Sequence, residues 1–439
     1  KINKIFSKDG KIIYSKAIGY ASIDGDNKIP ATTDTKYRIG SISKMFTAVI
    51  VFKLIEQGKL ELNTKLSKYY SEIPNSETIT IGNLLNHRSG IHSFTSDPEY
   101  KEWMTEPKSH EELIEHIASY EPDFPPDSTS YYSNSNYVLL GYIIEDITGK
   151  PYNDVLRENI TSKLALNSTY YGSKSDVKAM ESYSYSLVND EWDQSPETDM
   201  SIPHGAGAIV STPTDLVKFI DALFEYKLIS EKSLDQMMTL TENYGMGMFT
   251  FPFYQRTSYG HNGSIDGFGA MLQYYQEEKL ALAYCSNGQV YPMNEILIGI
   301  LSIYFEVDYT MPDFASAEVP EDILEQYTGE YTCPELPFNI EISKDGSRSI
   351  SLPSAAALAS SNAVPDGEST LSLWCISDIS ISQSLSRDFA RFFTVPSKAL
   401  TPRLIFPDLI IVACLAAALI FSSSSILNPV VPITCTFLA

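Results

Sequence analysis

Hydrophobic and polar residues alternate along residues 1–21, and the alternation breaks at Lys8-Asp9-Gly10. A period of two is typical of a strand with one buried face, and Asp-Gly is a common pair in tight turns. This segment therefore predicts an N-terminal β-hairpin. Residues 258–289 have a similar character and predict two or three more strands, the first after Tyr259-Gly260-His261 and the others at residues 270–275 and 280–285.

The middle of the chain follows a helical pattern instead. Residues 45–57 are apolar on nearly every side, which predicts a buried helix, and Gly58 suits its C-terminal cap. Further helices are expected at residues 81–87, 110–119 (with a capping box, Ser109 and Glu112), 136–149 (ending at Gly149) and 213–225 (starting at Pro213). Helices in the middle and strands at both ends predict an α+β fold, in which one antiparallel sheet joins the two ends of the domain.

Composition changes along the chain and suggests three parts. We expect a main domain over residues 1–310, and a linker with the start of a small β-rich domain over residues 311–346. In the second part, residues 323–327 predict a short helix that precedes hairpin-like strands. Residues 347–439 form an atypical Ser-rich and apolar tail, whose run at 409–421 is shorter than the ~20 residues of a membrane span.

The net charge of −23 over 439 residues argues against binding to nucleic acid or to anionic lipid. No cysteine pair has the spacing of metal ligands, so we expect neither a zinc site nor a disulfide framework; the cysteines are Cys285, Cys333, Cys375, Cys414 and Cys435. The sequence starts at Lys1 without an initiator methionine or a signal peptide, and we expect the native N-terminus to lie outside it.

Candidate chemistry begins at Ser41-Ile42-Ser43-Lys44, which opens the predicted buried helix. A lysine three residues after a serine lies about one helical turn away, close enough to take the proton of the hydroxyl. The serine also lies at the positive end of the helix dipole. This pattern predicts a hydrolase that forms a covalent acyl-serine. A second Ser-x-x-Lys, Ser175 to Lys178, has no apolar helix behind it, and we expect no function there.

Tyr132-Ser133-Asn134 is expected on a loop between the rigid Phe124-Pro125-Pro126 turn and an apolar helix. Near a lysine ammonium, the phenolate of Tyr132 would be favoured and could act as a general base. Asn134 could orient the lysine or donate a hydrogen bond to a substrate amide.

His261-Asn262-Gly263 lies at the start of a predicted strand. A glycine there allows substrate to approach the backbone closely. The N–H group of Ser264, together with that of Ser41, would then form an oxyanion hole.

These three motifs, in this order, resemble the serine β-lactamase and penicillin-binding-protein superfamily. The most similar branch contains class C β-lactamases, D-alanyl-D-alanine carboxypeptidases, D-aminopeptidases and related esterases. The resemblance covers about residues 5–305 and extends to Tyr37-Arg38-Ile39-Gly40, Leu84-Leu85-Asn86-His87-Arg88-Ser89-Gly90, Leu140-Gly141-Tyr142-Ile143-Ile144-Glu145, Ser211-Thr212-Pro213-Thr214-Asp215-Leu216 and Tyr244-Gly245-Met246-Gly247.

The resemblance implies a role for each motif. Ser41 would be the nucleophile, and Lys44 and Tyr132 would be the acid–base pair. The substrate would be bound by Asn134, His261, Asn262, Gly263 and Ser264. It also implies an antiparallel sheet flanked by helices with a helical subdomain, no metal or cofactor, and a periplasmic or secreted location.

Two features depart from the family pattern. His261 stands where β-lactamases usually have the lysine that pairs with the substrate carboxylate, and histidine is only partly charged at neutral pH. The helix that usually precedes the first strand is not present before Ile2. The first departure favours a peptidase that acts beside a D-residue, or a small-ester esterase. A weak β-lactamase, or a penicillin-binding sensor or scaffold without turnover, stays open as an alternative.

The substrates implied are peptidoglycan-like peptides, esters or β-lactams. Several other residues have a structural interpretation at this stage. We expect His87 to hold a turn, and core packing is favoured for Trp103, Tyr244 and Met246. His110 and His116 would face different sides of a helix, which disfavours a metal role. His204 is equally consistent with pocket lining and with packing. No Gly-x-Ser-x-Gly motif occurs, which disfavours an α/β-hydrolase.

Overall fold

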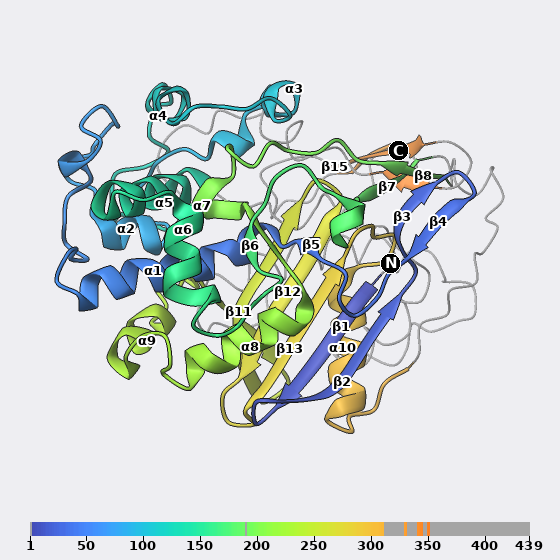
Figure 1. Cartoon of the computed structure of the whole chain (residues 1–439). Coiled ribbons are helices and arrows are strands. Elements are labelled where there is room, and N and C mark those ends of the chain that lie inside the picture. The colour runs from blue at the N-terminus through green and yellow to red at the C-terminus, as the bar shows by residue number, and fades with distance from the viewer. Residues whose placement is uncertain (1, 189–190, 311–328, 332–339, 346–348, 352–439) are drawn as a thin grey trace, which may run out of the picture. The chain divides into compact units, whose positions relative to one another are not determined.

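The computed structural model describes residues 2–188 and 191–310, and three short strands farther along the chain (Figure 1). The chain divides into two units, residues 1–290 and 291–439. The first unit contains all of the candidate site residues.

A six-stranded antiparallel sheet forms the framework of the first unit, in the order β10-β11-β12-β13-β1-β2. The strands are β1 (Ile2–Lys8), β2 (Lys11–Ile18), β10 (Phe249–Phe253), β11 (Arg256–Ile265), β12 (Phe268–Tyr275) and β13 (Leu280–Ser286). Strand β1 lies between β2 and β13, and Ile5 pairs with both Ser15 and Ala283. The prediction of one sheet that joins the two ends of the domain is therefore confirmed.

Local chemistry explains the turns of this sheet. Asp9 and Gly10 both have positive φ (49° and 70°), which the tight turn between β1 and β2 requires. Strand β10 was not predicted. Its Pro252 interrupts the strand pattern, and proline is tolerated at this position because β10 is an edge strand.

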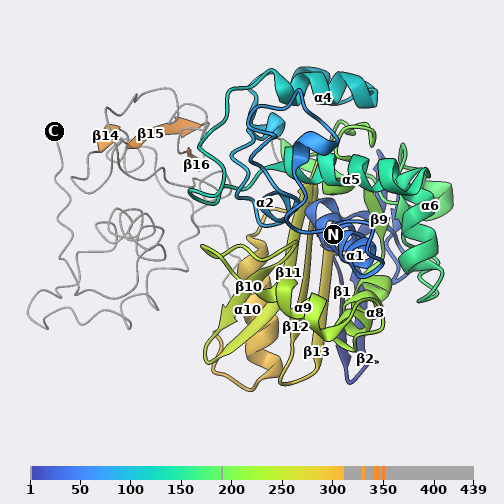
Figure 2. The same cartoon turned by 90° about the vertical axis from the view of Figure 1, so that its left-hand side faces the viewer.

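Helices gather at one end of the sheet and along one face (Figures 1 and 2). Helix α1 (Ser43–Glu56) is buried on nearly every side, as predicted, and packs against α5, α6 and α7. Helix α8 packs on β1, β12 and β13. The helices of the first unit are α1, α2 (Ile81–Leu85), α3 (Tyr100–Trp103), α4 (His110–Ala118), α5 (Asn134–Thr148), α6 (Tyr152–Leu156), α7 (His204–Gly207), α8 (Pro213–Phe224) and α9 (Glu231–Met238).

The predicted helix signals have the expected roles. Ser109 and Glu112 form a reciprocal capping box at the start of α4, and Gly149 ends α5 in a left-handed conformation. Pro213 occupies the first turn of α8. Helix α1 differs in one respect: it begins at Ser43, so Ser41 lies in a separate 3-10 turn, η1 (Gly40–Ile42).

The described residues of the first unit also form three smaller sheets. One has the order β5-β9-β6, and the others are the hairpins β3-β4 and β7-β8. Their strands are β3 (Tyr20–Asp24), β4 (Asn27–Pro30), β5 (Tyr37–Arg38), β6 (Tyr170–Tyr171), β7 (Tyr185–Val188), β8 (Glu191–Gln194) and β9 (Ile209–Ser211).

The second unit contains helix α10 (Met293–Tyr304) and a three-stranded sheet of β14 (Gly329–Tyr331), β15 (Ile340–Asp345) and β16 (Ser349–Ser351). The predicted boundaries at residues 310 and 346 stay predictions. The helix expected at 323–327 and the apolar run at 409–421 lie outside the described residues. Within the described part of the chain, no helix is both long and apolar enough to span a bilayer.

Candidate active site

Ser41 and Lys44 meet as their spacing predicts. Ser41 lies in η1, and Lys44 lies in the first turn of α1, where its side chain is completely buried. The Nζ atom of Lys44 lies 3.0 Å from Oγ of Ser41, within hydrogen-bond distance. The pair therefore has the separation that a proton transfer from serine to lysine needs.

Two carbonyl oxygens hold the Lys44 amine in place. Nζ donates to Oδ1 of Asn134 at 2.7 Å and to the backbone oxygen of Ala206 at 2.9 Å. Burial lowers the pKa of Lys44 well below its usual value, because the charged form is poorly solvated. A neutral amine has two N–H groups and one lone pair. In the structure Nζ donates to Oγ of Ser41 as well. The two carbonyl oxygens can only accept, so a neutral Lys44 would direct its lone pair to the Ser41 hydroxyl.

Tyr132 lies on the loop before α5, as expected, and only 8% of it is exposed. Its side chain contacts Ser41, and Nζ of Lys44 lies 4.9 Å from the centre of its ring. Burial raises the pKa of Tyr132, an effect larger than the opposing hydrogen bond with Ser41. The expectation of a resting phenolate was therefore wrong, because sequence does not reveal how completely this ring is desolvated. At rest Tyr132 is a neutral phenol.

Asn134 is the first residue of α5, and both ends of its amide are engaged within the protein. Its Oδ1 accepts from Lys44, and its Nδ2 donates to Oγ1 of Thr95 at 2.8 Å. Of the two roles considered for Asn134, this arrangement matches orientation of the lysine. The second N–H group of the Asn134 amide is not used by these two bonds.

The third motif lies within β11, in close contact with the turn that carries Ser41. A Cβ atom on Gly263 would lie 1.9 Å from the Ile39 oxygen, so only glycine allows this approach. A Cβ atom on Gly40 would lie 2.8 Å from the Ser264 nitrogen. The backbone that carries Ser41 and the backbone that carries Ser264 are thus as close as two main chains can pack, while the Asn262 and Ser264 side chains are exposed.

His261 is buried and uncharged. Burial, reinforced by the nearby Lys44, lowers its pKa to about 3, and its Nδ1 lies 2.5 Å from the Asn262 oxygen. The partial positive charge expected for this histidine is therefore absent at neutral pH. The site has no imidazolium at this position to pair with a substrate carboxylate.

The other candidates separate clearly from this cluster. Lys178 lies in an exposed turn, and Ser175 is half-buried, with its backbone N–H donating to Oε2 of Glu197 at 2.9 Å. The ring of His87 stacks on Tyr132 at 4.5 Å, and its Nδ1 accepts the Ser133 N–H, which agrees with a structural role. His204 packs among tyrosine rings, 3.6 Å from Glu145.

Two contributors to the site were not predicted. One is the backbone oxygen of Ala206, and the other is Thr95, which fixes the Asn134 amide. In the sequence, only the run of small residues Gly205-Ala206-Gly207 indicated that the backbone at Ala206 packs closely against another segment. Thr95 gave no signal, because its contact depends on how two distant segments meet.

A model of the Beta-lactamase family matches residues 4–299, about two thirds of the chain. This chain belongs to the Beta-lactamase family. It is a serine hydrolase of the kind that the resemblance predicted, and the matched region contains each residue of the cluster around Ser41.

Curated relatives agree with this membership. The chain is 29% identical over 284 residues to a putative penicillin-binding protein of Bacillus subtilis, covering 64% of this chain and 69% of the relative. It is 28% identical over 288 residues to the teichoic acid D-alanine hydrolase of Staphylococcus aureus, covering 64% and 68%.

Solved structures of family members have the same fold. The D-amino acid amidase of Ochrobactrum anthropi, in complex with D-phenylalanine, matches with a TM-score of 0.62 at 27% identity, covering 70% of this chain and 94% of the amidase. An octameric penicillin-binding protein homologue from Pyrococcus abyssi has a TM-score of 0.62 at 26% identity, covering 80% and 83%. The predicted α+β, β-lactamase-like fold is thereby confirmed.

Proposed function

We propose that this family member hydrolyses esters or amides of D-amino acids through an acyl-enzyme on Ser41. The observation that carries the proposal is the buried Lys44 amine, which lies 3.0 Å from Oγ of Ser41 and is held in place by two carbonyl acceptors. Relatives named as a teichoic acid D-alanine hydrolase and a D-amino acid amidase support a D-amino acid beside the bond that is cleaved.

The proposed reaction moves one proton around the site. Neutral Lys44 accepts the Ser41 proton as Oγ attacks the carbonyl carbon, and the N–H groups of Ser41 and Ser264 stabilise the oxyanion. The protonated amine then returns the proton to the leaving alcohol or amine through the Tyr132 hydroxyl. In the second half, water attacks the acyl carbon and gives a proton to Lys44 through Tyr132. The bond between Ser41 Oγ and the acyl carbon then breaks, Oγ takes that proton back from Lys44, and the acid product leaves. Each step balances without a metal or cofactor.

The neutral His261 supports a choice among substrates. A carboxypeptidase or β-lactamase acts on a substrate that carries a carboxylate near the cleaved bond, and the usual lysine of the third motif pairs with it. His261 offers no such charge. This favours esters and amides without that carboxylate, and it disfavours both efficient β-lactam hydrolysis and a penicillin-binding role.

An extracytoplasmic location belongs to the same proposal. It is supported by relatives whose names refer to penicillin binding and to teichoic acid. The expected binding partner is a small-molecule substrate or the end of a cell-wall polymer, and not nucleic acid.

The nucleophile can be tested with a matched pair of variants. Ser41→Ala should abolish hydrolysis of D-alanine p-nitrophenyl ester, because no other group can form the acyl-enzyme. Ser175→Ala, in the second Ser-x-x-Lys, should keep the wild-type rate. The measurement is release of p-nitrophenol, with mass spectrometry of the trapped acyl-protein. Equal activity of Ser41→Ala and wild type would refute the assignment.

A further inference from the structure

Arg38 is a buried cation three residues before Ser41, and the proposed reaction does not use it. Its side chain is 2% exposed, yet it lies on the short strand β5 directly before η1. An arginine in such a place must have its charge balanced and its N–H groups bonded.

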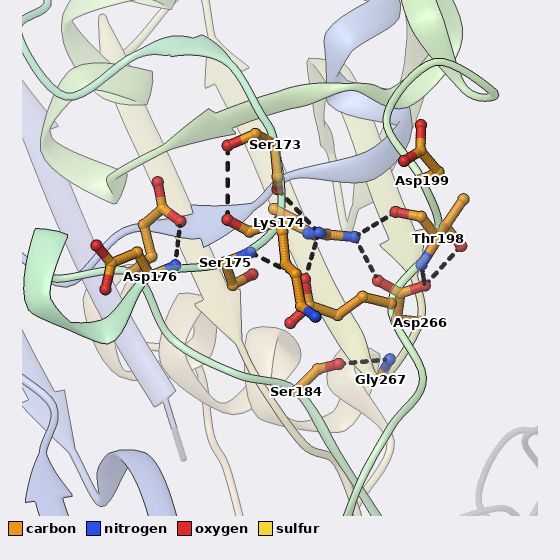
Figure 3. A network of polar contacts seen from close by, with 12 residues as sticks. Ser173, Lys174, Ser175, Asp176, Ser184, Thr198, Asp199, Asp266 and Gly267 are labelled. Carbon is orange, nitrogen blue, oxygen red and sulfur yellow. Dashed lines mark hydrogen bonds and ion pairs between the residues drawn. The ribbon is translucent and has the colours of Figure 1, made fainter. Parts of the chain in front are cut away.

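The guanidinium binds acceptors from three separate segments. Nη1 donates to Oδ2 of Asp266 at 3.0 Å and to the Thr198 oxygen at 2.8 Å. Nη2 donates to Oε2 of Glu197 at 2.6 Å and to the Ser173 oxygen at 3.0 Å. Figure 3 shows this network, with Thr198 and Asp266 on one side and residues 173–176 on the other.

Asp266 is as firmly held as Arg38. Its side chain is fully buried, and its Oδ1 accepts from the backbone N–H and the hydroxyl of Thr198 at 3.0 and 2.7 Å. It occupies the two-residue turn between β11 and β12 with φ of 53°, a conformation that glycine adopts more easily. Asp266 thus adopts a backbone conformation that is unfavourable for a non-glycine residue, and its carboxylate binds Arg38 from this position.

The two ends of this ion pair flank the two N–H groups of the proposed oxyanion hole. Arg38 precedes Ser41 by three residues, and Asp266 follows Ser264 by two. Between them the backbones touch at Gly40 and Gly263. We propose that Arg38 and Asp266 are positioning residues, which lock η1 against β11 and so fix the separation of the Ser41 and Ser264 N–H groups. This inference rests on the proposed acyl-serine mechanism.

The effect should appear in the transition state. Both N–H groups must reach an oxygen that becomes negative only as the tetrahedral intermediate forms. A shift of β11 against η1 would weaken that contact while leaving the ground-state contacts of the substrate intact. The expected signature is a lower kcat with little change in KM.

Asp266→Asn is the most informative variant. It keeps the size of the side chain, and Glu197 still balances the Arg38 charge, so the fold should survive. In one orientation the new amide nitrogen would face Nη1 of Arg38, so that two donors oppose each other. In the other orientation the amide nitrogen would face Thr198, which would lose its acceptor. We expect kcat for D-alanine p-nitrophenyl ester to fall roughly 10- to 100-fold, the scale of a small misplacement at a reacting centre. Arg38→Lys, which cannot bind four acceptors, should act in the same direction.

Binding of a boronic acid distinguishes positioning from a general loss of structure. A boronate on Ser41 places an oxygen where the oxyanion would lie, so Asp266→Asn should weaken its binding by about the same factor as kcat. Glu278→Gln is the matched control: it breaks another Arg–carboxylate pair of β11, Arg256 with Glu278 at 2.8 Å, near the other end of that strand. This control should change neither value.

Four outcomes would be decisive. Parallel losses of kcat and boronate affinity, with unchanged thermal unfolding, support the inference. Wild-type kcat in both folded variants overturns it, as do equal effects of Asp266→Asn and Glu278→Gln. If the wild-type protein forms no acyl-enzyme, the proposed function itself is wrong. The comparison of wild type with Ser41→Ala detects this separately.

Discussion

At the scale of single residues, burial decides the charge of each group near Ser41. Lys44 and His261 both have lowered pKa values, and Tyr132 has a raised one; in each case burial is the largest cause. Burial therefore favours the uncharged form of each group. This suits the proposed mechanism, in which one proton moves among Ser41, Lys44 and Tyr132.

The neutrality of His261 predicts a flat pH profile for carboxylate recognition. With its pKa lowered to about 3, His261 is uncharged throughout the range from pH 5 to 8. An ordinary histidine, with a pKa near ~6.5, would lose its charge in that window and weaken carboxylate binding as pH rises. We expect KM to stay constant from pH 5 to 8 for a substrate with a carboxylate.

The matched measurement uses the corresponding methyl ester, for which KM should also stay constant over the same range. A rise in KM with pH for the carboxylate substrate alone would show that His261 does carry a charge.

Sequence predicted the parts of the site that depend on local geometry. Ser41 and Lys44 are three residues apart, so a single helical turn brings them together. Asn134 and Ala206 lie 90 and 162 residues from Lys44, and their contacts depend on the packing of whole helices. The protonation of Tyr132 was misjudged for the same reason, since desolvation is a property of the assembled site.

At the scale of elements, the approach of α5 to α7 controls where the Ala206 oxygen lies. A Cβ atom on Gly141 of α5 would lie 2.3 Å from Nδ1 of His204 and 3.1 Å from the Gly205 nitrogen. Helices α5 and α7 therefore contact each other through a glycine on each side, Gly141 and Gly205. Any side chain at position 141 must therefore move α7, and with it one of the two carbonyl oxygens that hold Lys44.

Gly141→Ala tests this contact. In an exposed helix, alanine is more favourable than glycine by about 1 kcal/mol. Here overpacking should dominate and lower the free energy of unfolding by roughly 1–3 kcal/mol. The ester-hydrolysis rate should fall as well, because Ala206 moves away from Lys44. Gly141→Val should show larger losses of both kinds. Urea unfolding and p-nitrophenol release measure them, and a stabilised, fully active Gly141→Ala would contradict the argument.

The elements also show where sequence patterns are sufficient. The capping box of α4 and the glycine after α5 were predicted because each depends on a few consecutive residues. Strand β10 and helix α9 were not predicted. Pro252 hides the strand pattern of β10, and α9 has only three buried residues in its eight. Strand β10 is held by pairing with the adjacent β11, whereas α9 is held by distant Glu56, which accepts from Ser230 and Ser233.

At the scale of the whole molecule, the sheet depends on a strand from the start of the chain. Ile5 lies in β1, between β2 and β13, and is completely buried, whereas Ile12 lies in the edge strand β2 and is 47% exposed. Ile5→Ala should lower the free energy of unfolding by roughly 2–5 kcal/mol, because it leaves a cavity in the core.

The matched variant Ile12→Ala should change that free energy by no more than about 0.5 kcal/mol. Chemical denaturation followed by circular dichroism measures both values. Similar losses for the two variants would show that β1 is not an interior strand in solution.

The same arrangement has a consequence for synthesis of the protein on the ribosome. Phe6 pairs with Leu282, so β1 emerges long before its partner β13 exists. At about 5–20 residues per second, roughly 15–55 s pass before the two strands can join. Until then the nascent chain exposes an unfinished sheet edge, a feature that favours aggregation. Ser41 is made early, but β11 with Ser264 is made near the end of the domain, so the proposed oxyanion hole cannot form before nearly all of the domain has been translated.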